Sequence, residues 1–167
     1  MPPLPSKNAK VDIIYFSWTG NTKKVVEIIS QELQDSIEVN VIEIKPKTNY
    51  PYFVWLLLSF IPGLGTAIRC EGTTSDLILI CMPKWTFNCP PITSFLKAVQ
   101  LKGKVAYLVI TYGGWDEMRY AESYRNKIGQ LCEEVRDVLL VKRSRIASEE
   151  GKIRNWVKDM IGNLGER

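Results

Sequence analysis

Short apolar runs and stretches with helical spacing alternate along the whole chain. Three of the runs are nearly continuous in β-branched and aromatic residues, which is typical of strands buried on both faces of a parallel sheet, and a fourth alternates apolar with polar positions like an edge strand. The predicted strands are residues 11–16, 37–44, 76–82, 103–110 and 137–142. Apolar residues that recur every three or four positions predict helices over 23–33, 53–61, 92–99, 118–135 and 149–164. This alternation predicts an α/β fold with a parallel sheet covered by helices on both faces.

The stretch 52–64 is the most apolar part of the chain and does not fit this pattern. It is too short to cross a bilayer, which takes about 20 apolar residues. One interpretation is a buried connecting helix that ends at Pro62 and Gly63. The other is an apolar patch, because one core-facing stripe cannot hide every apolar residue from Phe53 to Ile61. We expect a helix that is partly buried and partly at an interface, in a homodimer or at a membrane surface.

Composition narrows the classes of function. The chain has 167 residues, a net charge of +4 and no long basic block, so we expect no nucleic-acid partner. It has no histidine, so histidine is excluded as a catalytic base and as a metal ligand. Its four cysteines form no Cys-x-x-Cys pair, so we expect no metal. Residues 1–9 are proline-rich and predict a flexible arm before a single domain over 10–167. Without a secretory signal, we expect a cytoplasmic protein, with a place at the membrane periphery as a further expectation.

Three hydroxyls and a glycine lie between the first strand and the first helix, in the stretch 17–22. The start of a helix has free N–H groups and a partial positive charge, which suits a phosphate. Ser17, Thr19 and Thr22 can add donors, and Gly20 lets the backbone approach a ligand. The alternative is that Asn21 or Thr22 simply caps the helix. The crowding of polar groups around a glycine favours the anion site.

Two later loops also follow predicted buried strands. Residues 83–88 are rich in aromatic groups and lead into Pro90-Pro91 and a helix; Trp85 and Phe87 either face a ligand or cover the core. Residues 111–115 contain a glycine pair that allows close approach of the backbone, or else form a turn before a helix that Asp116 caps. Because the carboxyl ends of parallel strands meet at one edge, we expect all three loops to lie together.

The three loops, in this order, resemble the flavin-binding loops of the flavodoxin family. The resemblance covers about residues 10–164 and leaves the unusual apolar segment 46–75 without a match. It implies a flavodoxin-like, doubly wound five-stranded sheet of order 2-1-3-4-5 and flavin mononucleotide (FMN) as cofactor. It further implies that Trp85 stacks on the flavin ring and that Asn88 takes the place of a family glycine beside it. The implied cofactor-binding residues are Ser17, Trp18, Thr19, Gly20, Asn21, Thr22, Pro83, Lys84, Trp85, Thr86, Phe87, Asn88, Thr111, Tyr112, Gly113, Gly114 and Trp115.

The function that this resemblance implies is electron transfer between redox partner proteins, with no catalytic side chain because the chemistry belongs to the flavin. One alternative is a flavin reductase that uses NAD(P)H or a quinone, since aromatic residues form an apolar wall beside the loops. The other is a domain of the same fold that binds no cofactor and serves only for interaction.

Overall fold

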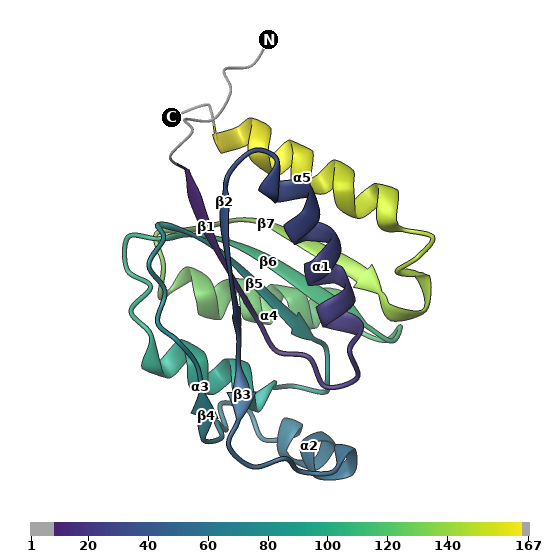
Figure 1. Ribbon diagram of the computed structural model, residues 1–167. Coiled ribbons are helices and arrows are strands. Elements are labelled where there is room, and N and C mark those ends of the chain that lie inside the picture. Colours follow the sequence, from purple (N-terminus) through teal and green to yellow (C-terminus); the bar gives the residue numbers. More distant parts are fainter. Residues whose placement is uncertain (1–8, 165–167) are drawn as a thin grey trace.

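The computed structural model describes residues 9–164 (Figure 1). The predicted flexible arm therefore lies outside the described residues, apart from Ala9, whose carbonyl accepts a hydrogen bond from Glu38 N at 3.0 Å.

Five parallel strands form the central sheet in the order β2-β1-β5-β6-β7. They are β1 (Lys10–Tyr15), β2 (Glu38–Glu43), β5 (Leu77–Pro83), β6 (Val105–Tyr112) and β7 (Glu134–Lys142). β5 and β6 are buried along nearly their whole length, as their continuous apolar sequences require. Counted among themselves, the five strands have the predicted order 2-1-3-4-5, so the predicted fold is confirmed. A separate antiparallel pair, β3 (Lys45–Pro46) and β4 (Ile68–Arg69), was not predicted.

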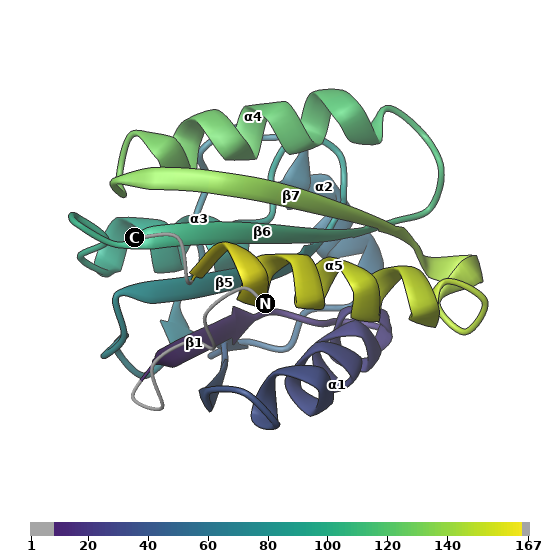
Figure 2. The ribbon, with the colours of Figure 1, turned by 90° about the horizontal axis from the view of Figure 1, so that it is seen from above.

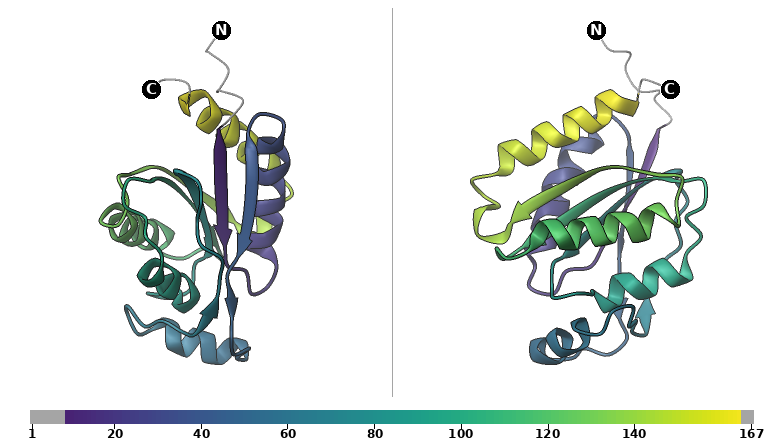
Figure 3. Two further views of the ribbon diagram at one scale, coloured as in Figure 1. Left: turned by 60° about the vertical axis from the view of Figure 1, so that its left-hand side comes forward. Right: turned by 180° about the vertical axis from the view of Figure 1, so that it is seen from behind.

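Helices cover both faces of the sheet (Figures 2 and 3). On one face lie α1 (Asn21–Gln34) and α5 (Glu150–Leu164), and on the other α3 (Pro90–Ala98) and α4 (Glu117–Gly129). Each helix buries one stripe, such as Val25, Ile29 and Leu33 on α1. Two apolar clusters result, one on each side of the sheet.

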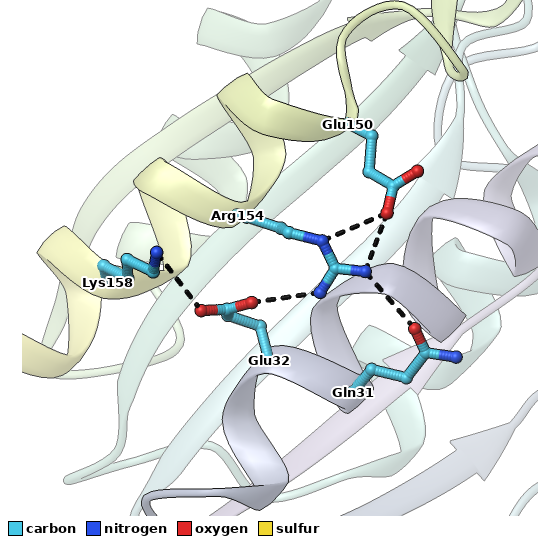
Figure 4. A network of polar contacts seen from close by, with 5 residues as sticks. All are labelled: Gln31, Glu32, Glu150, Arg154 and Lys158. Carbon is cyan, nitrogen blue, oxygen red and sulfur yellow. Dashed lines mark hydrogen bonds and ion pairs between the residues drawn. The ribbon is translucent and has the colours of Figure 1, made fainter.

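Arg154 on α5 joins the two helices of the first face (Figure 4). Its guanidinium donates to Glu32 on α1 at 3.0 Å and to Glu150 at 2.7 Å. Lys158 Nζ approaches Glu32 at 3.7 Å. Polar contacts thus connect the outer sides of α1 and α5 above the apolar core that both helices cover.

α2 (Tyr52–Ser59) lies beyond the carboxyl ends of β1 and β2, below the sheet in Figure 3. It buries Trp55 and Ser59, whereas Phe53 and Leu57 are 62% and 63% exposed. No helix within residues 9–164 is long and apolar enough to span a bilayer.

The prediction of a helix up to about residue 135 was wrong. α4 ends at Gly129, and β7 begins at Glu134. The chain turns back after Ile128, whose carbonyl accepts hydrogen bonds from Leu131 N and Cys132 N. Val135 then pairs with Ala106 of β6, so the sheet, and not the helical spacing, decides the conformation of this segment.

Candidate functional site

The loops that follow β1, β5 and β6 meet at one edge of the sheet, as predicted. Residues from all three line one small depression, which adds Tyr52 from α2 and Arg143 from the 3₁₀ turn after β7 (η1, Arg143–Arg145). The lining residues are Trp18, Thr19, Asn21, Tyr52, Pro83, Lys84, Trp85, Thr111, Tyr112, Gly113 and Arg143. Its volume is only ≈ 30 Å³, whereas ligand pockets commonly hold about 300 Å³ or more.

The first loop presents the start of α1. Gly20 occupies the cap position with φ 86°, a left-handed conformation that favours glycine, and no side chain caps the helix. The Asn21 amide instead donates to Thr19 Oγ1 at 2.9 Å, and Ser17 Oγ accepts from Lys23 N at 3.2 Å. The alternative that Asn21 or Thr22 caps the helix is therefore wrong; Ser17 satisfies the amide of Lys23 in the first turn, and the amides of Asn21 and Thr22 are left to a ligand or water.

Thr22 lies under this loop and not on its surface. Its side chain is 1% exposed, and its hydroxyl is 2.7 Å from the hydroxyl of Thr111 at the end of β6. Lys84 N donates to Thr111 O at 2.7 Å, so Thr111 bonds to both of the other loops. Thr22 and Thr111 therefore hold the loops together, and a direct contact of Thr22 with a ligand is not supported by its position.

Trp85 in the second loop is mostly inside the core. It is 8% exposed, its indole stacks on Trp55 of α2 at 5.9 Å and 27°, and it contacts Phe16 edge-on at 5.5 Å. Part of it still lines the depression. The stacking of Trp85 on a ligand ring stays a prediction, with one indole face already covered by Trp55.

The side chain of Asn88 is not available for the predicted role. Asn88 is fully buried, and its amide nitrogen donates to Ile61 O at 3.2 Å and Leu64 O at 2.7 Å. Its oxygen accepts from Thr93 and Tyr124 hydroxyls. Because these bonds use the whole side chain, it anchors the segment after α2, and a role of the Asn88 backbone beside a ligand stays a prediction.

Thr86 and Phe87 also contact α2 and do not line the depression. The Thr86 hydroxyl is 2.7 Å from Ser59 Oγ, and Phe87 N donates to Ser59 O at 3.1 Å. The Phe87 ring is 41% exposed and contacts Phe60 with ring centroids 6.1 Å apart. The second loop and α2 thus form one connected unit.

The third loop contributes Thr111, Tyr112 and Gly113 to the depression, but Gly114 and Trp115 lie outside it. Trp115 is 70% exposed, with Lys84 Nζ 5.3 Å from its ring centre. Asp116 has φ 52° at the start of α4, but its carboxylate pairs with Arg119 and forms no cap bond. The predicted side-chain cap by Asp116 is therefore wrong.

Cationic side chains cover the backbone of the third loop. A Cβ added to Gly113 would lie 3.1 Å from Arg143 Nη2, and one added to Gly114 would lie 3.4 Å from Lys142 Nζ. Burial lowers the pKa of Lys84, and the nearby carboxylates of Asp116 and Glu117 oppose that shift. The site edge is therefore positively charged.

A second, open hollow adjoins the depression on the side of α1. Its volume is ≈ 440 Å³, and Asn21 and Arg143 line both hollows. Lys24 lies in the second one. Glu27 and Glu150 also line this hollow, so its lining is mixed in charge, and Arg143, which lines both hollows, is the cation best placed for an anion at the start of α1.

Sequence reasoning missed Tyr52 and Arg143 as site residues. Arg143 directly follows β7, the neighbour of β6, so the rule that carboxyl ends of parallel strands share an edge would have found it. That rule does not apply to Tyr52, because its position depends on how the segment between β2 and β5 folds over the sheet.

Comparison with known proteins gives one relative in sequence and several in structure. The chain is 40% identical over 151 residues to a protein of Archaeoglobus fulgidus whose name is given only as "Uncharacterized protein"; the match covers 90% of this chain and 98% of that one. No family model matches the chain.

Solved structures resemble the chain at low sequence identity. A putative flavoprotein from Bacteroides eggerthii has a TM-score of 0.71 and 23% identity over 92% of this chain and 98% of that one. A flavodoxin from the domain Archaea has a TM-score of 0.59 and 19% identity, covering 93% and 98%. A Lactobacillus acidophilus flavoprotein in complex with FMN has a TM-score of 0.59 and 20% identity, covering 86% and 99%. The chain therefore belongs to the same family as the Archaeoglobus fulgidus protein, and its fold is that of the flavodoxin-like flavoproteins.

Proposed function

We propose that the protein binds FMN at the carboxyl edge of its sheet and transfers electrons between redox partner proteins. The observation that carries this proposal is that Thr19, Trp85 and Gly113, from three separate loops, line one depression. The similarity of the fold to flavoproteins, one of them in complex with FMN, supports the choice of cofactor.

The first loop fits the phosphate end of FMN. The start of α1 has no side-chain cap, and Thr19 and Asn21 offer polar groups beside it. Arg143 and Lys24 supply positive charge at the adjoining hollow. A helix start with neutral donors and two cations matches a phosphate dianion.

The site has to open before it can hold the flavin ring of FMN. A volume of ≈ 30 Å³ cannot hold a flavin ring, so side chains have to move before it enters. Arg143 and Lys142 lie over Gly113 and Gly114 and are long and flexible, which makes them the easiest groups to displace. Trp55 Nε1, next to Trp18 and Trp85, is buried without a hydrogen-bond partner among the described residues, which makes it a candidate donor to a ligand once the site opens.

When bound, FMN supplies the redox chemistry. The residues of this chain would hold its phosphate with Thr19 and Arg143, exclude water from the ring with Trp85 and Tyr52, and place a cation near the ring with Lys84. Positive charge there favours the reduced, negatively charged form of the cofactor. Electrons would pass to partners at the rim that stays exposed.

A second candidate is a flavin reductase that takes NAD(P)H or a quinone as substrate. The observation that favours it is the apolar wall beside the depression, where Tyr52 is 44% and Phe87 41% exposed. Anaerobic mixing of the FMN-loaded protein with NADPH or NADH tests it. Fast bleaching of the flavin without any partner protein would favour the enzyme over the carrier.

The test of the proposed function is titration of the purified protein with FMN and with riboflavin, which lacks the phosphate, followed by flavin fluorescence. We expect FMN to bind more tightly than riboflavin. Arg143→Gln should weaken FMN binding about tenfold, since a hydrogen bond to a charged group contributes ~1.5–3 kcal/mol. Thr19→Ala should weaken it a few-fold, and both variants should leave riboflavin binding nearly unchanged.

Lys10→Gln is the matched control, because Lys10 lies at the opposite end of β1, where it pairs with Glu38. Equal affinity for FMN and riboflavin would contradict the phosphate site. Absence of binding of either flavin would favour the interaction domain without cofactor.

A further inference from the structure

Exposed apolar side chains gather on the outer side of α2. Phe53, Leu57, Phe60 and Ile61, here called the α2 face, are 62%, 63%, 51% and 52% exposed. Phe53 and Leu57 lie one helical turn apart on α2, on the side opposite the buried Trp55 and Ser59, and Phe60 and Ile61 follow at the C-cap and in the next turn. A contiguous apolar surface of this kind marks a site of interaction with a protein or a membrane.

The α2 face is held in this orientation by contacts on the inner side. Trp55 packs between Phe16, Tyr50 and Trp85, and the Ser59 hydroxyl bonds to Thr86. After the helix, Ile61 O and Leu64 O accept from the buried Asn88 amide. The helix therefore cannot turn its apolar side inward without breaking these contacts. The exposure of the α2 face is thus a consequence of the fold.

Two cations lie beside the face, and the face itself carries no charge. The chain has no charged residue from Thr48 to Ile68. Lys97 donates to Gly63 O at 2.6 Å, four residues after the helix, and Arg119 lies 5.1 Å from the ring of Phe87, which contacts Phe60. Arg119 also pairs with Asp116, so Lys97 is the stronger source of positive charge at this rim.

An anionic surface complements an apolar face with cations beside it better than a second copy of the chain does. In a symmetric dimer through the α2 face, the cations of both copies would face one another around the contact. A partner protein would meet a face with no polar side chain, although protein interfaces carry about one hydrogen bond per 100–200 Å². Exposed Tyr52 and Trp115, next to Lys84, are aromatic groups of the type enriched where lipid headgroups meet water.

We propose that the α2 face binds the surface of a bilayer that contains anionic phospholipids, with Phe53, Leu57, Phe60 and Ile61 inserted among the lipids and Lys97 and Arg119 at the headgroups. This inference goes beyond the proposed function and does not depend on it, because none of these six residues lines the depression.

The experiment is sedimentation of the full chain with vesicles of phosphatidylcholine alone or mixed with phosphatidylglycerol. The wild-type protein should sediment with the mixed vesicles and far less with the neutral ones. Phe53→Ser with Leu57→Ser should lower binding by about tenfold or more, since each buried CH₂ contributes to membrane affinity. Leu131→Ser is the matched control: Leu131 is 40% exposed beyond the end of α4, and its loss should change nothing.

A second pair of variants tests the charge. Lys97→Gln and Arg119→Gln should each lower binding to the mixed vesicles about fivefold. Lys152→Gln, an exposed cation on α5, should not. Circular dichroism of every variant verifies that the fold is kept.

Three results would overturn the inference. One is failure of the wild-type protein to sediment with either vesicle, and another is equal binding to neutral and anionic vesicles. The third is a dimer in analytical ultracentrifugation that Phe53→Ser with Leu57→Ser converts to a monomer while vesicle binding is absent; the α2 face would then bind a second copy.

Discussion

The helix pair α1/α5 and the helix α2 place their apolar side chains differently: the pair turns them toward the sheet, and α2 exposes many of them to solvent. α1 and α5 turn their apolar stripes to the sheet and their charged groups to solvent, where Arg154 bridges Glu32 and Glu150. α2 buries Trp55 and Ser59 and exposes Phe53 and Leu57. The first arrangement is what stability of the core requires. The exposed side of α2 adds nothing to the core, so its apolar side chains have to be explained by something outside the chain.

The two regions are also held by different interactions. The α1/α5 pair shares the apolar cluster that includes Val25, Ile29 and Val157. α2 is attached mainly through one large side chain, Trp55, and through hydrogen bonds to the loop after β5. Substitutions in each region can therefore distinguish the side chains that stabilise the fold from the exposed side chains that do not.

The largest expected effect is at Trp55. Trp55→Ala should lower the free energy of unfolding by ~3–5 kcal/mol, because it removes a fully buried indole from among four aromatic rings. Leu57→Ala, two residues further on and 63% exposed, should change it by only about 0.5 kcal/mol or less. Urea unfolding of the two variants measures both values. Similar losses would mean that the outer side of α2 does contribute to the core.

A smaller effect is expected at Asp12, which holds the end of the segment that returns from α2 to the sheet. Its carboxylate accepts from Thr74 N at 2.6 Å, Ser75 N at 2.8 Å and the Asn40 amide at 2.9 Å. Asp12→Asn should cost ~1–3 kcal/mol at neutral pH, because an amide cannot accept all three bonds. Urea unfolding at pH 7 measures this loss.

The pH dependence gives Asp12 a second signature. Burial raises the pKa of this carboxyl, but the hydrogen bonds from Ser75, Asn40 and Thr74 outweigh burial and leave it below the ordinary value of 3.8. Because the folded pKa is the lower one, the stability that Asp12 adds is present above the unfolded value and is lost as the pH falls through the folded value. Stability should therefore decline less steeply below about pH 4 in Asp12→Asn than in the wild type. An identical slope in both proteins would contradict this assignment.

The smallest effect is expected on the α1/α5 side. Glu32→Gln removes the negative charge that pairs with Arg154 and Lys158 and should lower the urea midpoint only slightly, since partly exposed ion pairs add little. The difference from wild type should vanish in about 1 M NaCl, where the screening length is ~3 Å. A large loss that persists in salt would show that this helix pair depends on its polar contacts more than on its apolar core.

The sequence was sufficient for the sheet and for the meeting of the loops. Continuous apolar runs such as 76–82 can only be central parallel strands, and Thr19, Trp85 and Gly113 follow three such strands, so their closeness is a consequence of the topology.

The details that decide access to the site could not be read from the sequence. The packing of Trp85 on Trp55 and the position of Arg143 over Gly113 join residues far apart in the chain. The bonds of Asn88 to Ile61 and Leu64 depend on the path of the segment after α2, which no periodicity determines. The pair β3–β4, with two residues in each strand, is too short to leave a pattern.

The hydrogen bonds at Ser59 and Asn88 have a mechanical consequence. They fasten α2 to the loop after β5, while Thr22 and Thr111 fasten the loops after β1 and β6 to each other. Because Lys84 N also donates to Thr111 O, the three loops and α2 form one continuous set of hydrogen bonds around the depression. A displacement of α2 would therefore act on the loop that carries Trp85.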